Sequence, residues 1–244
     1  MELFCRWPNN AYPAKSEYKL SSALPVVLVP GFATSAARTW GENAWYDLLA
    51  DCGRQSFPLD VMGSGTAPKP HDPAAYANVE EDLFSRMPDG PVDAIGFSLG
   101  ARLLLQLACE HPGKFNSLIV AGVGRNLFER DGTSEQIAAA IDGTAPTTDP
   151  LARYFVQLAE APDQDREALA AFMRRPNPPA LTPEMLSAVT CPVLVVLGDK
   201  DFAGPADPLC EALSDCRLVT LRGVDHFATP KDFGFIDAAL QFLS

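Results

Sequence analysis

The feature of this sequence with the most direct chemical potential is a serine held between two glycines. Ser98 lies in a G-x-S-x-G motif at positions 96–100, after the apolar run 92–97 and before the helical run 101–110. A strand, a tight turn and a helix in this order expose a serine hydroxyl to a substrate. Side chains at positions 96 and 100 would collide in so sharp a turn, and glycine has none. The helix start also supplies free N–H groups for a developing negative charge.

A nucleophilic serine needs a base to accept its proton, and the chain has three histidines. His71 lies in a proline-bounded loop well before the serine. His111 ends the helical run after the serine, where the helix dipole favours a histidine for structural reasons. His226 follows the strand-like run 217–221 and precedes a helical run. Loops after strands carry the functional groups of parallel sheets, so we predict that His226 is the base.

The acid that orients such a histidine should also follow a strand. The continuous apolar run 192–197 is typical of a parallel strand covered on both faces, and Asp199 and Asp201 come directly after it. Asp225 adjoins the histidine in sequence, but adjacent side chains rarely point at each other. Asp199 and Asp201 therefore both remain candidates on position alone.

The order of serine, acid and histidine along the chain resembles that of the α/β-hydrolase superfamily. The resemblance extends from about residue 25 to the C-terminus. In that superfamily the acid is the last residue of a G-x-x-D motif, which implies Asp201 here. It also implies that Asp199 is a turn or capping residue.

The same resemblance implies an oxyanion hole. The apolar run 24–29 is followed by Pro30-Gly31-Phe32, where members of the superfamily often carry His-Gly-x. The backbone N–H groups of Phe32 and Leu99 would be the donors, and proline in place of histidine leaves these backbone groups in place. Residues 60–66 are similar to the D-x-R-G-x-G-x-S motif of relatives, but Met62 replaces the arginine and removes any ion pair that it makes there.

Strands and helices alternate along most of the chain, which predicts a mostly parallel sheet with helices on both faces, as in the α/β-hydrolase fold. We expect strands at 25–29, 56–61, 92–97, 118–121, 192–197 and 217–221, and helices at 44–51 (capped by Asn43) and 74–86. Residues 1–24 are short for the opening antiparallel strands of this fold, so that edge is expected to be abbreviated.

The alternation stops between residues 125 and 180. This stretch predicts helices at 134–141, 149–160 and 165–174, with Thr182 capping the next one. We expect residues 1–124 and 181–244 to form the core domain. Residues 125–180 would form a small helical cap inserted after strand six, where relatives carry a cap that partly dries the pocket.

Several residues near the expected site suggest a pocket for an apolar acyl or alcohol group. The two cap aromatics among them could equally be ordinary core residues. The residues expected to bind substrate are Gly31, Trp40, Tyr154, Phe155 and Phe227.

Composition excludes other classes of protein. The chain has 244 residues, enough for one large domain, and a net charge of −12, which disfavours nucleic acid and anionic membranes. No signal peptide or membrane-length apolar run is visible. The six cysteines lack metal-site spacing, so we expect a reduced, cytoplasmic protein; only Cys210 and Cys216 are close enough to question. We expect a monomer or homodimer without metal or organic cofactor.

These observations predict a serine hydrolase that cleaves a small-molecule carboxylic ester, with a small to medium acyl or alcohol group, through an acyl-enzyme and water. Serine at the turn weighs against dehalogenases and epoxide hydrolases, whose nucleophile is a carboxylate. Cleavage of a C–C bond, lactone or thioester, or perhydrolysis, would use the same triad. A ligand-binding receptor with negligible turnover is the alternative of another class.

Overall fold

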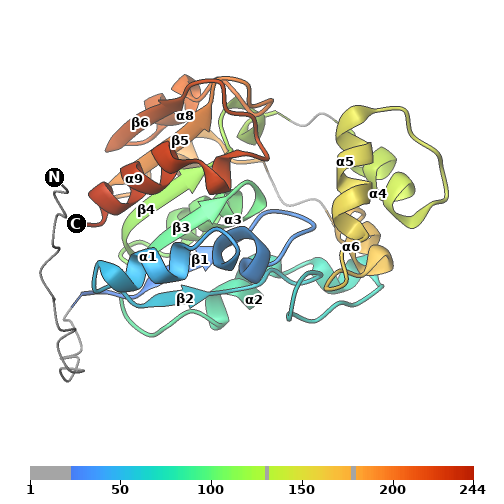
Figure 1. Ribbon diagram of the computed structural model, residues 1–244, viewed down its shortest axis with the longest axis horizontal. Coiled ribbons are helices and arrows are strands. Elements are labelled where there is room, and N and C mark those ends of the chain that lie inside the picture. The colour runs from blue at the N-terminus through green and yellow to red at the C-terminus, as the bar shows by residue number, and fades with distance from the viewer. Residues whose placement is uncertain (1–22, 130–131, 177–179) are drawn as a thin grey trace, which may run out of the picture.

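A computed structural model describes residues 23–129, 132–176 and 180–244 (Figure 1). Its centre is a six-stranded sheet in the order β2-β1-β3-β4-β5-β6, and every neighbouring pair is parallel. The carboxyl ends of the strands therefore meet at one edge, where ligands bind in sheets of this kind. This confirms the predicted architecture. The strands are β1 (Val26–Val29), β2 (Ser56–Pro58), β3 (Val92–Phe97), β4 (Phe115–Ala121), β5 (Val193–Gly198) and β6 (Cys216–Leu221).

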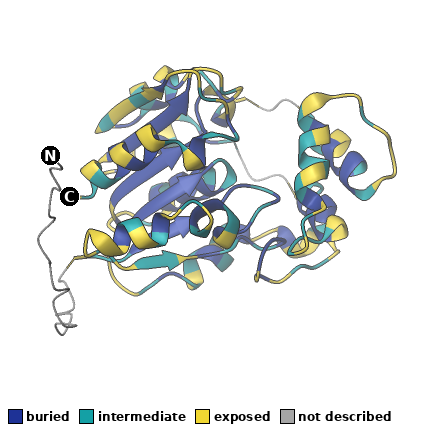
Figure 2. Cartoon of the chain, in the orientation of Figure 1, coloured by how far each residue is buried: buried dark blue, intermediate teal, exposed yellow. Residues whose placement is uncertain are grey.

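Apolar side chains alternate between the two faces of the sheet and build a core on each. On β1, Val26 and Leu28 contribute to the core beneath α1 (Trp45–Asp51) and α9 (Phe233–Phe242). Val27 and Val29 belong to the opposite core. That core is covered by α2 (Val79–Ser85), α3 (Leu99–Glu110), α7 (Pro183–Leu186) and α8 (Asp207–Ala212). Figure 2 shows the central strands buried and the outer faces of these helices exposed, while the edge strands β2 and β6 are partly exposed.

Three further helices form a separate group beside the sheet (Figure 1). They are α4 (Ser134–Asp142), α5 (Pro150–Ala159) and α6 (Arg166–Met173), as predicted, and they share an apolar cluster of their own. Asp149 and Asp165 cap α5 and α6 by accepting backbone N–H bonds. The group follows β4, which contains the predicted strand 118–121 after which the helical insertion was expected. Residues 1–22, to which the opening edge was assigned, lie outside the described part.

Local interactions change some predicted boundaries. The strand expected to reach residue 61 ends at Pro58, because Asp60 accepts hydrogen bonds from the N–H groups of Ala36 and Thr66, each at 2.7 Å, and holds a loop there. The helix expected at 74–86 is divided into a 3-10 helix at Pro73–Tyr76 and α2.

Two predicted helix caps have different outcomes. Asn43 does not cap α1; its amide nitrogen instead donates to the carbonyl of Thr39, at 2.9 Å, in a π-helical turn over Ala37–Gly41. Ala44 occupies the cap position. The cap at Thr182 is confirmed by a 3.2 Å bond from the Met185 N–H. Two more 3-10 turns cover Arg125–Leu127 and Thr229–Lys231.

The cysteines differ from expectation in one place. Cys210, in α8, forms a disulfide with Cys216, which begins β6, and their Cα atoms lie 5.4 Å apart. The sequence left this pair open, and the short turn between helix and strand brings the two side chains together. Cys52, Cys109 and Cys191 are free. In the described ranges, no helix has both the length and the apolar character needed to cross a bilayer.

Candidate active site

Ser98 occupies the sharp turn between β3 and α3 in an unusual backbone conformation. Its φ is 52° and its ψ is −110°, a strained combination for a residue with a side chain. The turn is tied down because the Ser98 N–H donates to the Ala121 carbonyl at 2.8 Å. A Cβ at Gly96 would lie 2.6 Å from the Ala101 nitrogen, and one at Gly100 would lie 2.3 Å from the Val29 carbonyl oxygen. The two glycines of the motif are thus sterically required.

The structure brings the predicted base and acid to this serine. His226 Nε2 lies 3.0 Å from Ser98 Oγ. His226 Nδ1 lies 2.9 Å and 3.0 Å from the two carboxylate oxygens of Asp201. The side chains of His226 and Asp201 are only 4% and 0% exposed. A buried carboxylate, an imidazole and a hydroxyl in one hydrogen-bonded row is the arrangement that makes a serine nucleophilic.

The other two carboxylates near the histidine have structural contacts instead. Asp199 accepts a 2.7 Å hydrogen bond from the Gly223 N–H and thereby holds the loop that leads to His226. Asp225 accepts from the Ala228 N–H at 2.9 Å. Asp201 also accepts from the Ala203 N–H at 2.8 Å, which fixes its carboxylate. Position in the sequence alone did not separate Asp199 from Asp201.

Aromatic rings and one glycine hold the imidazole of His226. Its ring centroid lies 4.4 Å from that of Phe202, 4.9 Å from that of Phe97 and 5.2 Å from that of Phe227. Gly122 has a φ of 69°, and a Cβ there would lie 3.1 Å from His226 Cε1. The sequence analysis did not identify Gly122. The signal that could have identified it is its position directly after the predicted strand that ends at Ala121.

The predicted oxyanion donors lie next to the serine on two different segments. Leu99 is the first residue of α3, so its N–H is among the donors that a helix start leaves without an intrahelical acceptor. The segment that carries Phe32 packs on the serine turn, since a Cβ at Gly31 would lie 3.5 Å from Ser98 Cβ. Pro30 leaves this close contact intact.

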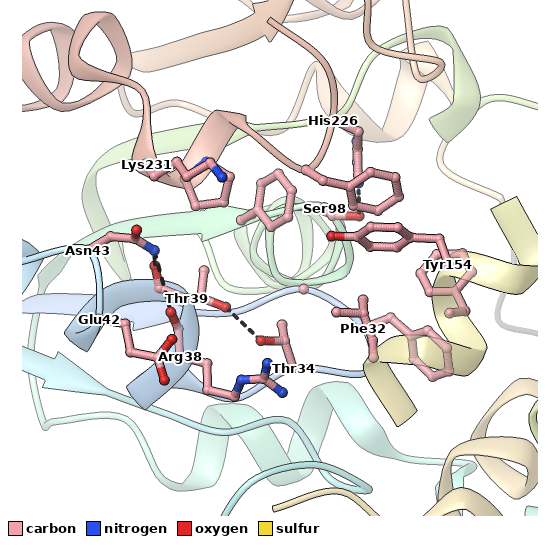
Figure 3. A pocket seen from close by; sticks show the side chains of 16 residues that line it. Phe32, Thr34, Arg38, Thr39, Glu42, Asn43, Ser98, Tyr154, His226 and Lys231 are labelled. Atoms are coloured by element: carbon pink, nitrogen blue, oxygen red, sulfur yellow. Dashed lines mark hydrogen bonds between the residues drawn. The ribbon is translucent and has the colours of Figure 1, made fainter. Parts of the chain in front are cut away.

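A small cavity of about 140 Å³ opens in front of Ser98 and His226. Four of the residues predicted to bind substrate line it: Gly31, Tyr154, Phe155 and Phe227. Figure 3 shows the Tyr154 side chain pointing into this space beside Ser98. The Tyr154 ring stacks on Phe227, with 3.5 Å between centroids. Polar residues that sequence reasoning missed line the opposite side: Thr34, Arg38, Thr39, Glu42, Asn43 and Lys231.

A second, larger cavity of about 750 Å³ lies between the sheet edge and helices α4–α6. Phe32 and Phe155 line both cavities, and Leu99 lines the larger one. The Phe32 ring lies 5.4 Å from that of Phe155 and stacks on that of Phe172 at 5.6 Å, so rings from core and cap form a continuous apolar wall.

Trp40 is the one predicted substrate-binding residue that lines neither cavity. It is completely buried and packs edge-on against Trp45, with 5.2 Å between ring centroids. The expectation is wrong because the π-helical turn that carries Trp40 directs the ring into the core beneath α1.

The two remaining histidines lie outside the site, as predicted. His111 stacks on Phe84 at 3.8 Å, at the far end of α3. His71 forms a hydrogen-bonded ion pair with Asp165 at 2.9 Å and a second ion pair with Glu167 at 3.0 Å, and so links a core loop to α6. The hydrogen bond to Asp165 raises the pKa of His71.

Known proteins share this fold and part of this sequence. Residues 26–235 match the alpha/beta hydrolase family. A pimeloyl-[acyl-carrier protein] methyl ester esterase of Neisseria meningitidis serogroup B is 29% identical over 217 residues, which cover 77% of this chain and 83% of that protein.

Solved structures agree in fold. A putative non-heme bromoperoxidase of Mycobacterium tuberculosis superposes with a TM-score of 0.71 at 17% identity, over 91% of this chain and 92% of that one. A serine hydrolase involved in carbazole degradation superposes with a TM-score of 0.65 at 22% identity, again over 91% and 92% of the two chains.

Proposed function

The chain belongs to the α/β-hydrolase family and is an ester hydrolase, and we propose that it acts through Ser98, His226 and Asp201 on esters of a small alcohol. The observation that carries this proposal is the row of hydrogen-bonding distances: 3.0 Å from Ser98 Oγ to His226 Nε2 and 2.9 Å from His226 Nδ1 to Asp201. The serine thus lies within hydrogen-bonding distance of its base, and the base lies within hydrogen-bonding distance of the acid that orients it.

In the proposed reaction Ser98 Oγ attacks the ester carbonyl while His226 Nε2 accepts its proton. Asp201 holds the imidazole in the tautomer with a proton on Nδ1 and stabilises its charged form. The N–H groups of Leu99 and Phe32 donate to the oxyanion, and each such donor contributes roughly 10²–10³ in rate. His226 then protonates the departing alcohol. Water repeats the sequence on the acyl-enzyme and releases the acid.

We assign the two halves of the ester to different cavities. His226 must protonate the leaving alcohol, and it lines only the smaller cavity. The alcohol therefore occupies about 140 Å³ and the acyl chain extends into about 750 Å³. The relative named as a methyl ester esterase acts on an ester of the smallest alcohol, which supports this assignment.

We propose that residues 125–180 are the cap over this site. The cap helices supply Tyr154 and Phe155 to the smaller cavity and Phe172 to the larger. These rings surround the serine with apolar surface, which strengthens the electrostatic interactions during the reaction. The acyl chain would pass between them and the core residue Phe32.

The test compares methyl, ethyl and butyl esters of acids from acetate to palmitate, with wild type and Ser98→Ala. We expect multiple turnover by the wild type, a decrease in kcat/KM from methyl to butyl esters, and loss of at least about 10⁴-fold in Ser98→Ala. Circular dichroism of both proteins controls for folding. Serine-independent turnover would overturn the assignment of the nucleophile. A single turnover followed by arrest would favour a receptor, and a preference for butyl esters would reverse the assignment of the cavities.

A further inference from the structure

The larger cavity is basic, although the chain as a whole carries a net charge of −12. Two glutamates, Glu129 and Glu135, are the acidic residues of its described lining. The basic residues that line it are Arg102, Arg125, Arg174 and Arg175. Such a concentration of positive charge in an acidic protein creates a local field that attracts anions.

The two glutamates already compensate two of these arginines. Glu129 lies 3.5 Å from the Arg125 guanidinium. Glu135 lies 2.9 Å from the Arg174 guanidinium, which also pairs with Asp142 at 2.7 Å. The acidic residues of the lining are therefore engaged by these two arginines.

Arg175 is held differently. Its Nη1 donates to the Phe172 carbonyl at 2.8 Å, and its guanidinium carbon lies 3.8 Å above the Phe172 ring. Among the described residues, no carboxylate forms an ion pair with it. Burial lowers the pKa of Arg175 to about 10; the negative charge of Glu80 opposes this and the positive charge of Arg102 adds to it. A cation that has lost water without gaining an ion pair is a favourable site for an anion.

The position of Arg175 relative to Ser98 connects this charge to the reaction. Arg175 covers the Phe172 ring, and Phe172 stacks at 5.6 Å on Phe32, a proposed oxyanion donor. Arg102 lies one helical turn beyond Ser98 on α3, on the same side of the helix. A chain that leaves the serine along the ring wall thus enters the cavity that Arg175 lines.

We infer that the larger cavity recognises a carboxylate at the far end of the acyl chain, with Arg175 as its direct contact. The substrate class is then the half-ester of a dicarboxylic acid with a small alcohol. One guanidinium can bind one carboxylate in a bidentate geometry. Because two glutamates also line the cavity, it suits a ligand with a single negative charge. This inference rests on the proposed ester hydrolysis and names its substrate.

The first experiment measures kcat/KM for monomethyl and dimethyl esters of the same dicarboxylic acids over a range of chain lengths. The wild type should prefer the charged half-ester once its chain is long enough to pass the Phe32–Phe172 stack, and not before. Arg175→Gln should lower the charged-to-neutral ratio about 10- to 100-fold, and Arg175→Lys should retain part of it. Arg153→Gln, which removes an exposed cap charge that lines neither cavity, should leave this ratio unchanged.

The outcomes separate this inference from the proposed function. Equal losses for charged and neutral esters in Arg175→Gln would show that Arg175 only supports Phe172, and would overturn the inference while Ser98-dependent hydrolysis stands. A second measurement is independent of turnover: calorimetric binding of the long half-ester to Ser98→Ala. Adding Arg175→Gln should raise the Kd about 10- to 100-fold. An unchanged Kd would overturn the inference, whatever the activity assays show.

Discussion

The core edge and the cap contribute opposite sides of one site, but they hold their residues by different means. On the core side, Ser98 directly follows the buried strand β3, His226 follows the edge strand β6, and the Asp201 side chain is completely enclosed. On the cap side, Tyr154 and Phe155 are partly buried and contact rings of the core. The reacting groups are thus fixed by backbone geometry and buried hydrogen bonds. The cap residues are held by ring contacts, which side-chain substitution can alter without disturbing the sheet.

The largest effect should come from the buried acid on the core side. Asp201→Asn should lower kcat about 10⁴-fold, because the amide favours the wrong tautomer of His226. Asp199→Asn is the matched control: it follows the same strand but only accepts from the Gly223 N–H, so we expect less than about a tenfold loss. Steady-state kinetics on a methyl ester measures both. The reverse ranking would assign the acid to Asp199.

A smaller effect should follow from crowding the imidazole through the backbone. Gly122→Ala places a methyl group 3.1 Å from His226 Cε1 and 2.7 Å from a Phe97 ring carbon, at a φ of 69°. We expect kcat to fall about 10- to 100-fold, because displacement of a catalytic group is costly. Gly223→Ala has a similar φ of 76° and no neighbouring atom within 4 Å, so it should lower the melting temperature but preserve kcat. Equal kcat values for the two variants would contradict this role of Gly122.

On the cap side, a substitution should change selectivity more than chemistry. Phe155→Ala removes a ring that lines both cavities and packs at 5.4 Å against Phe32. We expect KM for long acyl chains to rise about 3- to 10-fold, the amount that one aromatic contact supplies. Val156→Ala changes a cap residue that lines neither cavity and is the control. A fall in kcat of the size expected for Asp201→Asn would show that the cap takes part in the chemistry.

The smallest effect should come from the surface link between core and cap. Hydrogen bonding to Asp165 raises the pKa of His71 above its ordinary value of 6.5. The contact therefore stabilises the fold fully below pH 6.5, and this contribution is lost as pH rises through the raised pKa. His71→Gln should lower the melting temperature by no more than about 2 °C near pH 6, with no difference near pH 9. A difference that grows with pH would refute this sign.

The sequence by itself determined the parts of the molecule that local patterns specify. Continuous apolar runs predict the buried strands of a parallel sheet, because a strand covered on both faces needs apolar side chains at every position. Two glycines around Ser98 predict the sharp turn, and the structure shows the clashes that any side chain there would cause. The helix caps at Asp149, Asp165 and Thr182 rest on local hydrogen bonds from backbone N–H groups two or three residues further along, and the cap at Thr182 was predicted from the sequence.

Only the tertiary structure decided contacts between residues that are distant in the chain. Asp199 and Asp201 follow the same strand and carry the same carboxylate; the packing of the His226 loop alone separates their contacts. Trp40 is buried because a π-helical turn, which has no clear sequence signal, directs its ring into the core. The contact of Phe172 with Phe32, which brings Arg175 near the site, depends on how the cap helices rest on the core. Periodicity along a chain reports which face of an element is buried, but it carries no information about which other element covers that face.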